Sequence, residues 1–188
     1  GRGMGYLGVG PFKCIAPTVY IIAASVLLYP KQQYLEGIDI AIARKIRRND
    51  ESHIDPNVKT CNYLNNVLAH LETRSYQVAE TLMLTNDGFL AEATTDNLFI
   101  AQYENGTPTL IYPKAEYALV GLTRNTVIKI ARQLGFVTRE SSTLLPHDLV
   151  GPNREVFITG TACGIMPIKT IDGMNTAAGG QRPLSDKL

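Results

Sequence analysis

Apolar residues gather in short runs that turn signals separate, and this pattern predicts more strands than helices. Apolar runs at residues 18–28 and 38–43 indicate buried strands. The turn sequence Asn86-Asp87-Gly88 predicts a hairpin between the strand that ends before it and the one that begins at Phe89. Further strands are expected at residues 78–85, 97–102, 136–140, 155–159 and 165–171.

Two segments have the helical period instead. Residues 62–77 and 123–134 place apolar side chains three and four positions apart. Gly135 stands where a C-terminal cap residue is expected. The expected apolar faces are Leu64, Val67, Leu68 and Leu71 in the first helix, and Val127, Ile130, Ala131 and Leu134 in the second.

Hairpin-joined strands with few helices predict an α+β fold, an α/β pseudo-barrel that is closed or partly closed, and not a regular doubly wound sheet. The 188 residues suffice for one domain, or for one domain and a piece of another. Both ends of the sequence look cut, which suggests a piece of a longer protein. Residues 29–33 are interpreted as a linker, 44–56 as a loop and 146–150 as a short helical turn.

Composition excludes several classes of function. The net charge of +1 does not indicate a basic surface that would bind nucleic acid or a membrane. The most apolar run, residues 19–28, is shorter than the roughly 20 residues that a bilayer requires. Cys14, Cys61 and Cys163 are widely spaced, so neither a disulfide framework nor a metal site is expected. A reducing, cytoplasmic setting fits best.

Two charged residues could carry chemistry. Lys59 precedes the first helix; a lone lysine is usually a solvated surface residue, but an amine at the edge of an apolar core can become the neutral nucleophile of a Schiff base. Glu92 lies among small residues between two apolar strands, in a segment that continues to Phe99. This segment is either a hairpin edge with turn-capping side chains or a carboxylate facing a cofactor.

Two further segments could bind an anion. Thr123, in Gly121-Leu122-Thr123-Arg124, is a suitable N-cap for the second helix, whose free N–H groups would face an anion. The small residues Gly160-Thr161-Ala162 follow a strand and would let a ligand approach the backbone. A plain helix cap and a plain turn are the commoner interpretations of such segments, so each signal is weak when taken singly.

In this order and spacing, however, the four segments resemble the class IV (fold-type IV) aminotransferases over nearly the whole chain. The sequence from Lys59 through Asn62-Tyr63-Leu64-Asn65-Asn66 is most similar to branched-chain aminotransferases, whereas Glu92 to Phe99 resembles the signature of the whole class. The resemblance implies pyridoxal 5′-phosphate as cofactor. It implies that Lys59 forms the Schiff base and shuttles the proton, that Glu92 pairs with the pyridine nitrogen, and that Tyr63 bonds the ring's 3′ oxygen.

The remaining roles are implied by the same resemblance. Leu122, Thr123, Gly160 and Thr161 would bind the cofactor phosphate, and Thr161 and Ala162 would offer N–H groups to the substrate carboxylate. Thr95 would line the pocket and Leu119 would pack on the ring. Residues 1–30 would be the tail of a small N-terminal domain and its linker, and residues 31–188 the large cofactor-binding domain.

The expected reaction is transamination of leucine, isoleucine or valine with 2-oxoglutarate by a homodimer or higher homo-oligomer. Three alternatives stay open: an aminodeoxychorismate lyase or a D-amino-acid aminotransferase of the same fold, and a non-catalytic fragment. The segment around Lys59 favours the branched-chain group. The phosphate-binding arginine and the substrate-closing groups of the small domain have no assignable counterpart in this chain.

Overall fold

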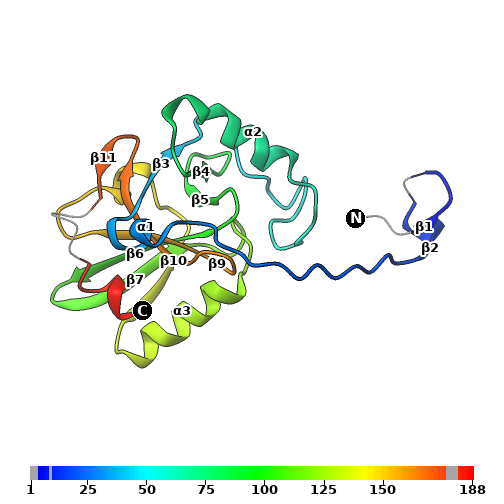
Figure 1. Ribbon diagram of the computed structural model, residues 1–188. Helices are drawn as coiled ribbons and strands as arrows, with labels where there is room; N and C mark the ends of the chain where they lie inside the picture. The colour runs from blue at the N-terminus through cyan, green and yellow to red at the C-terminus, as the bar shows by residue number, and fades with distance from the viewer. Residues whose placement is uncertain (1–3, 9, 177–181) are drawn as a thin grey trace.

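A mixed sheet forms the body of the protein (Figure 1). The computed structural model describes residues 4–8, 10–176 and 182–188. Within that part, the body contains helices α1 (Lys31–Glu36), α2 (Leu64–Glu72) and α3 (Leu122–Gln133). Its strands are β3 (Ile38–Ile42), β4 (Glu80–Leu84), β5 (Leu90–Ala93), β6 (Asn97–Glu104), β7 (Thr107–Pro113), β8 (Val137–Ser141), β9 (Glu155–Gly160), β10 (Gly164–Ile171) and β11 (Met174–Asn175).

The strands follow the order β5-β4-β3-β10-β9-β6-β7-β8, and β11 pairs with β10. The pairs β3–β4, β3–β10 and β7–β8 are parallel, and the others are antiparallel. The hairpin predicted at Asn86-Asp87-Gly88 is confirmed, since β4 and β5 pair antiparallel and Gly88 has a φ of 88°. The result is a half-barrel with few helices, as the α+β prediction required.

Each face of the sheet packs against its own apolar cluster. In β6, Leu98 and Ile100 contact one cluster, whereas Phe99 and Ala101 contact the other, as the alternation of a strand dictates. Phe99 stacks on Phe157 of β9 with ring centroids 5.2 Å apart. Helix α3 covers this second cluster with its buried residues Val127, Ile128 and Ala131, while the predicted face member Leu134 is 49% exposed.

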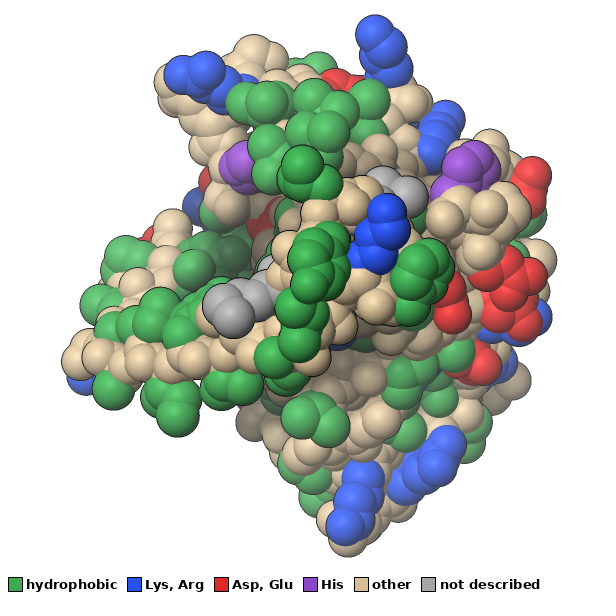
Figure 2. Space-filling model, turned by 90° about the vertical axis from the view of Figure 1, so that its right-hand side faces the viewer, with side chains coloured by type: hydrophobic (Ala, Val, Ile, Leu, Met, Phe, Trp, Pro, Cys, Tyr) green, Lys and Arg blue, Asp and Glu red, His purple; other side chains and the backbone are tan. Residues whose placement is uncertain are grey.

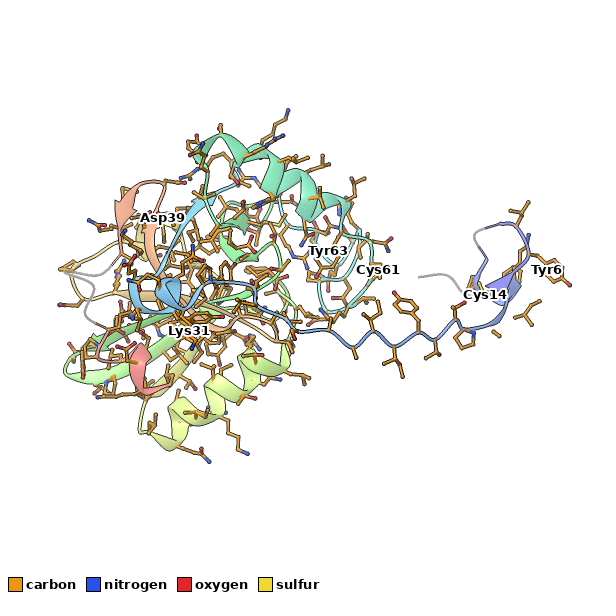
Figure 3. The ribbon with its side chains drawn as sticks, viewed as in Figure 1. Tyr6, Cys14, Lys31, Asp39, Cys61 and Tyr63 are labelled. Carbon is orange, nitrogen blue, oxygen red and sulfur yellow. The ribbon has the colours of Figure 1, made fainter. Side chains whose placement is uncertain are left out.

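The prediction of a buried strand at residues 18–28 is wrong. Residues 17–28 form an extended arm that leaves the body and leads to a small hairpin of β1 (Met4–Gly5) and β2 (Cys14–Ala16) (Figures 1 and 3). No strand of the described chain pairs with the arm, and Ile21 is 91% exposed. Figure 2, in which the arm points toward the viewer, shows hydrophobic side chains gathered on it. The arm has strand composition but pairs with no strand among the residues that the structure describes.

The body begins where the arm ends. Tyr29 is buried against the first apolar cluster, and α1 follows at once, where the sequence predicts a linker over residues 29–33. Strand β7 is a second element that the period of the sequence did not indicate. Among the described residues, no helix combines the length and the hydropathy needed to cross a membrane.

Helix α2 has the predicted period but the opposite orientation. Its buried residues are Asn66 and Ala69, whereas the expected apolar face is solvent-exposed. The reason lies in the contacts with the body: the Asn66 side chain donates a hydrogen bond to the Thr94 carbonyl at 2.6 Å, and the small Ala69 lets the helix approach the sheet closely. The exposed stripe consists of Leu64, Val67, Leu68 and Leu71.

Candidate active site

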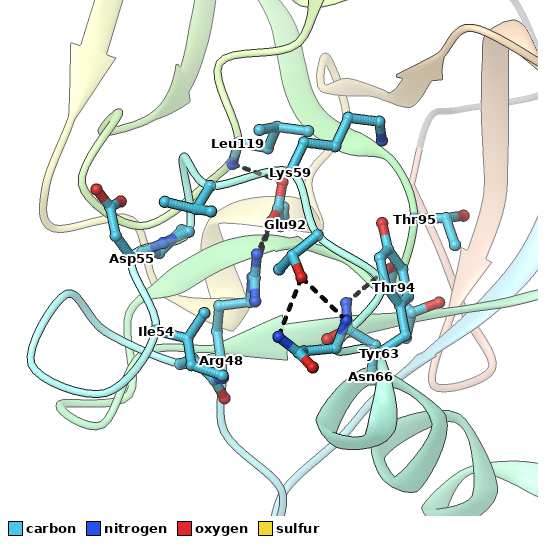
Figure 4. A pocket seen from close by; sticks show the side chains of 15 residues that line it. Arg48, Ile54, Asp55, Lys59, Tyr63, Asn66, Glu92, Thr94, Thr95 and Leu119 are labelled. Atoms are coloured by element: carbon cyan, nitrogen blue, oxygen red, sulfur yellow. Dashed lines mark hydrogen bonds and ion pairs between the residues drawn. The ribbon is translucent and has the colours of Figure 1, made fainter. Parts of the chain in front are cut away.

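A pocket lies where the loop after β3, the start of α2, the β5–β6 turn and the loop before α3 meet (Figure 4). Five residues singled out from the sequence line it: Lys59, Tyr63, Glu92, Thr95 and Leu119. Their elements are distant in sequence, and the strand order brings them together. An amine, a phenol and a carboxylate therefore line one pocket.

Glu92 is the most constrained of these groups. It belongs to β5, and its side chain is 7% exposed. Arg48 places both Nε and Nη2 at 2.8 Å from Glu92 Oε1. The other oxygen, Oε2, accepts hydrogen bonds at 3.0 Å from Asn97 Nδ2 and from the Leu119 backbone N–H. Three hydrogen bonds and one further ion-pair contact thus fix the carboxylate at the wall of the pocket.

Burial raises the pKa of Glu92 to about 7, although the ion pair and hydrogen bond with Arg48, the hydrogen bond from Leu119 and the more distant charge of Arg124 all act to lower it. A carboxyl with a pKa near neutrality can change its proton occupancy under working conditions. Such groups are concentrated at functional sites.

Asn57 joins the loop of Lys59 to the loop of Leu119. Its side chain donates to the Ala115 carbonyl at 2.9 Å and accepts from the Val120 N–H at 3.1 Å. Lys59 itself is exposed, and Tyr63 occupies the N-cap position of α2 with 37% of its surface exposed. The amine and the phenol are thus accessible from solvent, and the carboxylate lies deep.

The β5–β6 turn presents Thr95 to the pocket. The Thr95 hydroxyl lies 2.9 Å from Glu80 Oε2 and 2.9 Å from Asp96 Oδ2, so the side chain is held from behind. Glu80 and Asp96 are both buried. This turn belongs to the segment from Glu92 to Phe99, which is a structured wall as well as a hairpin edge.

The two candidate anion-binding segments both pack against that turn. A Cβ built on Gly121 would lie 2.4 Å from Asn97 Oδ1, and one built on Gly160 would lie 1.9 Å from Asp96 Oδ1. Only glycine permits these close approaches. Because Asn97 also pairs with Thr159 across β6 and β9, the start of α3 and the end of β9 lie on either side of one turn.

The structure corrects one detail of these segments. The N-cap of α3 is Gly121, not Thr123, and the helix begins at Leu122. Leu122, Thr161 and Ala162 are exposed, and Thr123 and Gly160 are half-buried. None of these five residues lines the pocket of Lys59; they lie at the two glycine turns beside it.

Sequence reasoning missed Arg48 and Asn66. Arg48 stands in a polar stretch with Arg44 and Arg47, and nothing in the sequence distinguishes it from them. Asn66 belongs to the segment that was noted after Lys59, but a helical asparagine that fastens the β5–β6 turn has no local signature. Both residues line the pocket.

The comparisons with known proteins agree with one another. A family model described as amino-transferase class IV matches residues 1–171. A putative branched-chain-amino-acid aminotransferase of Methanocaldococcus jannaschii is 42% identical over 176 residues, which cover 92% of this chain and 57% of that protein. The solved branched-chain amino acid aminotransferase of Escherichia coli is 30% identical with a TM-score of 0.75, over 88% of this chain and 53% of that one.

A further solved structure, the branched-chain amino acid aminotransferase of Thermobaculum terrenum in its PLP-form (holo-form), is 28% identical with a TM-score of 0.65 over 74% of this chain and 44% of that one. The chain therefore spans about half the length of the proteins named here.

Proposed function

Since the chain belongs to the class IV aminotransferases, we propose that it is the cofactor-carrying part of a pyridoxal 5′-phosphate enzyme that transaminates leucine, isoleucine and valine with 2-oxoglutarate. The observation that carries the proposal is the buried carboxylate of Glu92, held by three hydrogen-bond donors and the charge of Arg48 at the wall of a pocket that Lys59 also lines. The family, and the holo-form of the Thermobaculum terrenum relative, support the choice of cofactor.

The residues of the site fit this cofactor. Thr159, on the strand that leads to Gly160, has a buried hydroxyl without a hydrogen-bond partner in the part of the chain that the structure describes. Gly121 and Gly160 leave room for backbone approach that no side chain would permit. A phosphate group could be held between the N–H groups at the start of α3 and those of the turn after β9.

When bound, pyridoxal phosphate supplies an electron sink for the carbanion formed at the substrate's α-carbon. Lys59 would hold the cofactor through Nζ and carry the proton to and from that carbon. Glu92 would keep a proton at the ring nitrogen, and the Tyr63 phenol would hydrogen-bond the ring's 3′ oxygen. Leu119 would pack on the ring, and Thr95 would line the pocket. Leu122, Thr123, Gly160 and Thr161 would hold the phosphate, and Thr161 and Ala162 the substrate carboxylate.

A donor panel tests the choice of substrate. The protein is loaded with pyridoxal phosphate and offered L-leucine, L-isoleucine and L-valine, with D-alanine and aminodeoxychorismate as rivals, and glutamate formed from 2-oxoglutarate is measured with pyruvate release. Glutamate should form with the three branched-chain donors. Failure of all three would contradict the proposal; D-alanine turnover or pyruvate release would instead identify one of the rival activities.

A homodimer is part of the same proposal, and the exposed stripe of α2 supports it. A helix that turns four large aliphatic side chains to solvent beside the pocket offers an apolar surface of the kind that subunit interfaces cover. Leu64 is 71% exposed and follows Tyr63 directly, so a second copy at this stripe would lie next to the pocket. The cytoplasmic setting and the division into residues 1–30 and 31–188 remain proposals as well.

Charge placed on the stripe should separate the copies. We expect Val67→Lys combined with Leu71→Lys to convert the dimer to monomer in sedimentation equilibrium at micromolar concentration, because a buried ammonium at an interface is costly. Tyr103→Lys, at another exposed apolar position, serves as the control. A wild-type protein that sediments as a monomer would contradict the dimer, and an unshifted double variant would contradict the stripe as its interface.

A further inference from the structure

One side of the Glu92 carboxylate depends on a single residue. Oε1 accepts a hydrogen bond from Arg48 Nε at 2.8 Å, and Nη2 of the same residue lies at ion-pair distance, also 2.8 Å. Oε2 is held separately by Asn97 and by the backbone at Leu119. A hydrogen bond between two charged groups is roughly twice as strong as one between neutral groups, so Arg48 holds Oε1 firmly in position. Only Arg48, among the described residues, therefore pairs a full charge with this carboxylate directly.

No other cation of the described residues is placed to replace Arg48. Arg124 is the nearest alternative and acts on Glu92 through its field, but its guanidinium is bound to Glu140 at 3.0 Å and lies 4.8 Å from the ring centroid of Tyr112. Lys59 and Asp55, the remaining charged residues of the pocket lining, do not contact the carboxylate in any hydrogen bond or ion pair. The Arg48 side chain is 12% exposed, so its pair with Glu92 is largely shielded from water.

A buried carboxylate that loses its cation normally becomes neutral. A neutral carboxyl would turn a hydrogen toward one of its neighbours and could no longer hold a positive ring nitrogen. We propose that Arg48 is a positioning residue of the reaction: it keeps the Glu92 carboxylate charged and oriented at the pocket wall. This role rests on the proposed function of Glu92.

Linkage gives a readout that needs no cofactor. Burial places the pKa of Glu92 at about 7 in the folded protein, above the ordinary value of 4.5 that holds in the unfolded chain. The folded state therefore binds this proton more tightly, and the free energy of unfolding falls as pH rises from about 4.5 to about 7. Above that range both states are ionised and the contribution of Glu92 is constant.

Removing Arg48 should extend this fall to higher pH. In Arg48→Met the Glu92 carboxyl loses the charge that most lowers its pKa. The pH at which the free energy of unfolding stops falling should therefore rise by about 1–3 units. The loss of stability relative to wild type should be small at pH 5, where the carboxyl is protonated in both proteins, and large at pH 9. Thermal unfolding of both proteins without added cofactor, from pH 5 to 9, measures this difference in stability.

Matched variants assign the effect to the pair. In a Glu92→Gln background, Arg48→Met should cost the same at every pH. Arg48→Lys, which keeps the charge but loses the guanidinium, should restore most of the wild-type pH dependence of stability. Arg44→Met, at an exposed arginine paired with Asp172, should behave as wild type. A loss of stability in Arg48→Met that does not grow between pH 5 and 9 would overturn the inference.

Turnover separates this inference from the proposed function. With pyridoxal phosphate bound, kcat of Arg48→Met at pH 7 should fall on the order of tenfold, because a pKa raised by about one unit leaves roughly a tenth as much of the Glu92 carboxyl ionised. The fall should lessen as pH rises and Glu92 ionises. If Glu92→Gln slows the reaction and Arg48→Met does not, the role of Arg48 is wrong. If the pH dependence of stability in Arg48→Met changes as expected but Glu92→Gln leaves turnover unchanged, the proposed function of Glu92 fails instead. The Arg48–Glu92 ion pair is then structural.

Discussion

Replacing Lys59 with alanine is expected to abolish transamination and leave the fold intact. The change removes the only lysine that lines the described pocket, and with it both the amine that would attach the cofactor and the group that would carry the proton. A positioned general acid–base alone contributes about 10²–10⁴-fold, so the combined loss should reach background. Because Lys59 is exposed, its truncation removes little packing, and the unfolding midpoint should match wild type.

Borohydride reduction makes this prediction specific. Wild-type protein incubated with pyridoxal phosphate, reduced and digested should carry one modified lysine at position 59, and the Lys59→Ala variant should carry none. Lys129→Ala, at an exposed lysine of α3, is the matched control and should keep both the adduct and the activity. An adduct on another lysine, or turnover in Lys59→Ala above background, would remove Lys59 from its role.

Local signals predicted much of the fold because the interactions behind them are local. Asn86-Asp87-Gly88 forms its turn with backbone that only glycine adopts readily, and Gly135 ends α3 with a φ of 83° for the same reason. The strands around the turn are short apolar runs that turn residues bound, and β4 and β5 are buried throughout. The turn and the helix end require no partner from a distant part of the chain.

The errors arise where packing partners decide the outcome. Residues 17–28 have the apolar, β-branched composition of a buried strand, but composition does not reveal whether a neighbouring strand exists. The period of α2 was predicted correctly, yet its aliphatic stripe faces outward because Asn66 and Ala69 make the contacts with the body. Which side of a helix packs inward depends on distant residues such as Thr94, and the period cannot show it.

The residues of the candidate site likewise fall into those that their own sequence segment indicates and those that a distant partner determines. Lys59 and Glu92 were identified from the segments that carry them, and the structure brings both to one pocket. Arg48 was not identified, because its partner Glu92 lies 44 residues away and the two meet only when β4 pairs with both β3 and β5. The sequence around an arginine does not reveal a contact of this kind.

Replacing Glu92 with glutamine should slow transamination on the order of 10²-fold, the scale for losing one preorganised electrostatic partner. Glutamine keeps the shape of the side chain but cannot keep the ring nitrogen protonated. It also has one acceptor oxygen where the site has donors on both sides, so its amide group must face either Arg48 or the pair formed by Asn97 and the Leu119 N–H. One unmatched set of buried donors should cost about 1–3 kcal/mol of stability.

The pH dependence distinguishes loss of this charge from general damage. Wild-type stability should fall between pH 4.5 and about 7 as the unfolded chain releases the Glu92 proton before the folded protein does. Glu92→Gln should lose that part of the fall, while cofactor attachment at Lys59, measured by borohydride trapping, persists. Glu116→Gln, at an exposed carboxylate paired with Lys114, is the control and should leave rate and profile unchanged. A wild-type rate in Glu92→Gln would mean that the ring nitrogen has a different partner. The residue that keeps it protonated would then have to lie outside β5.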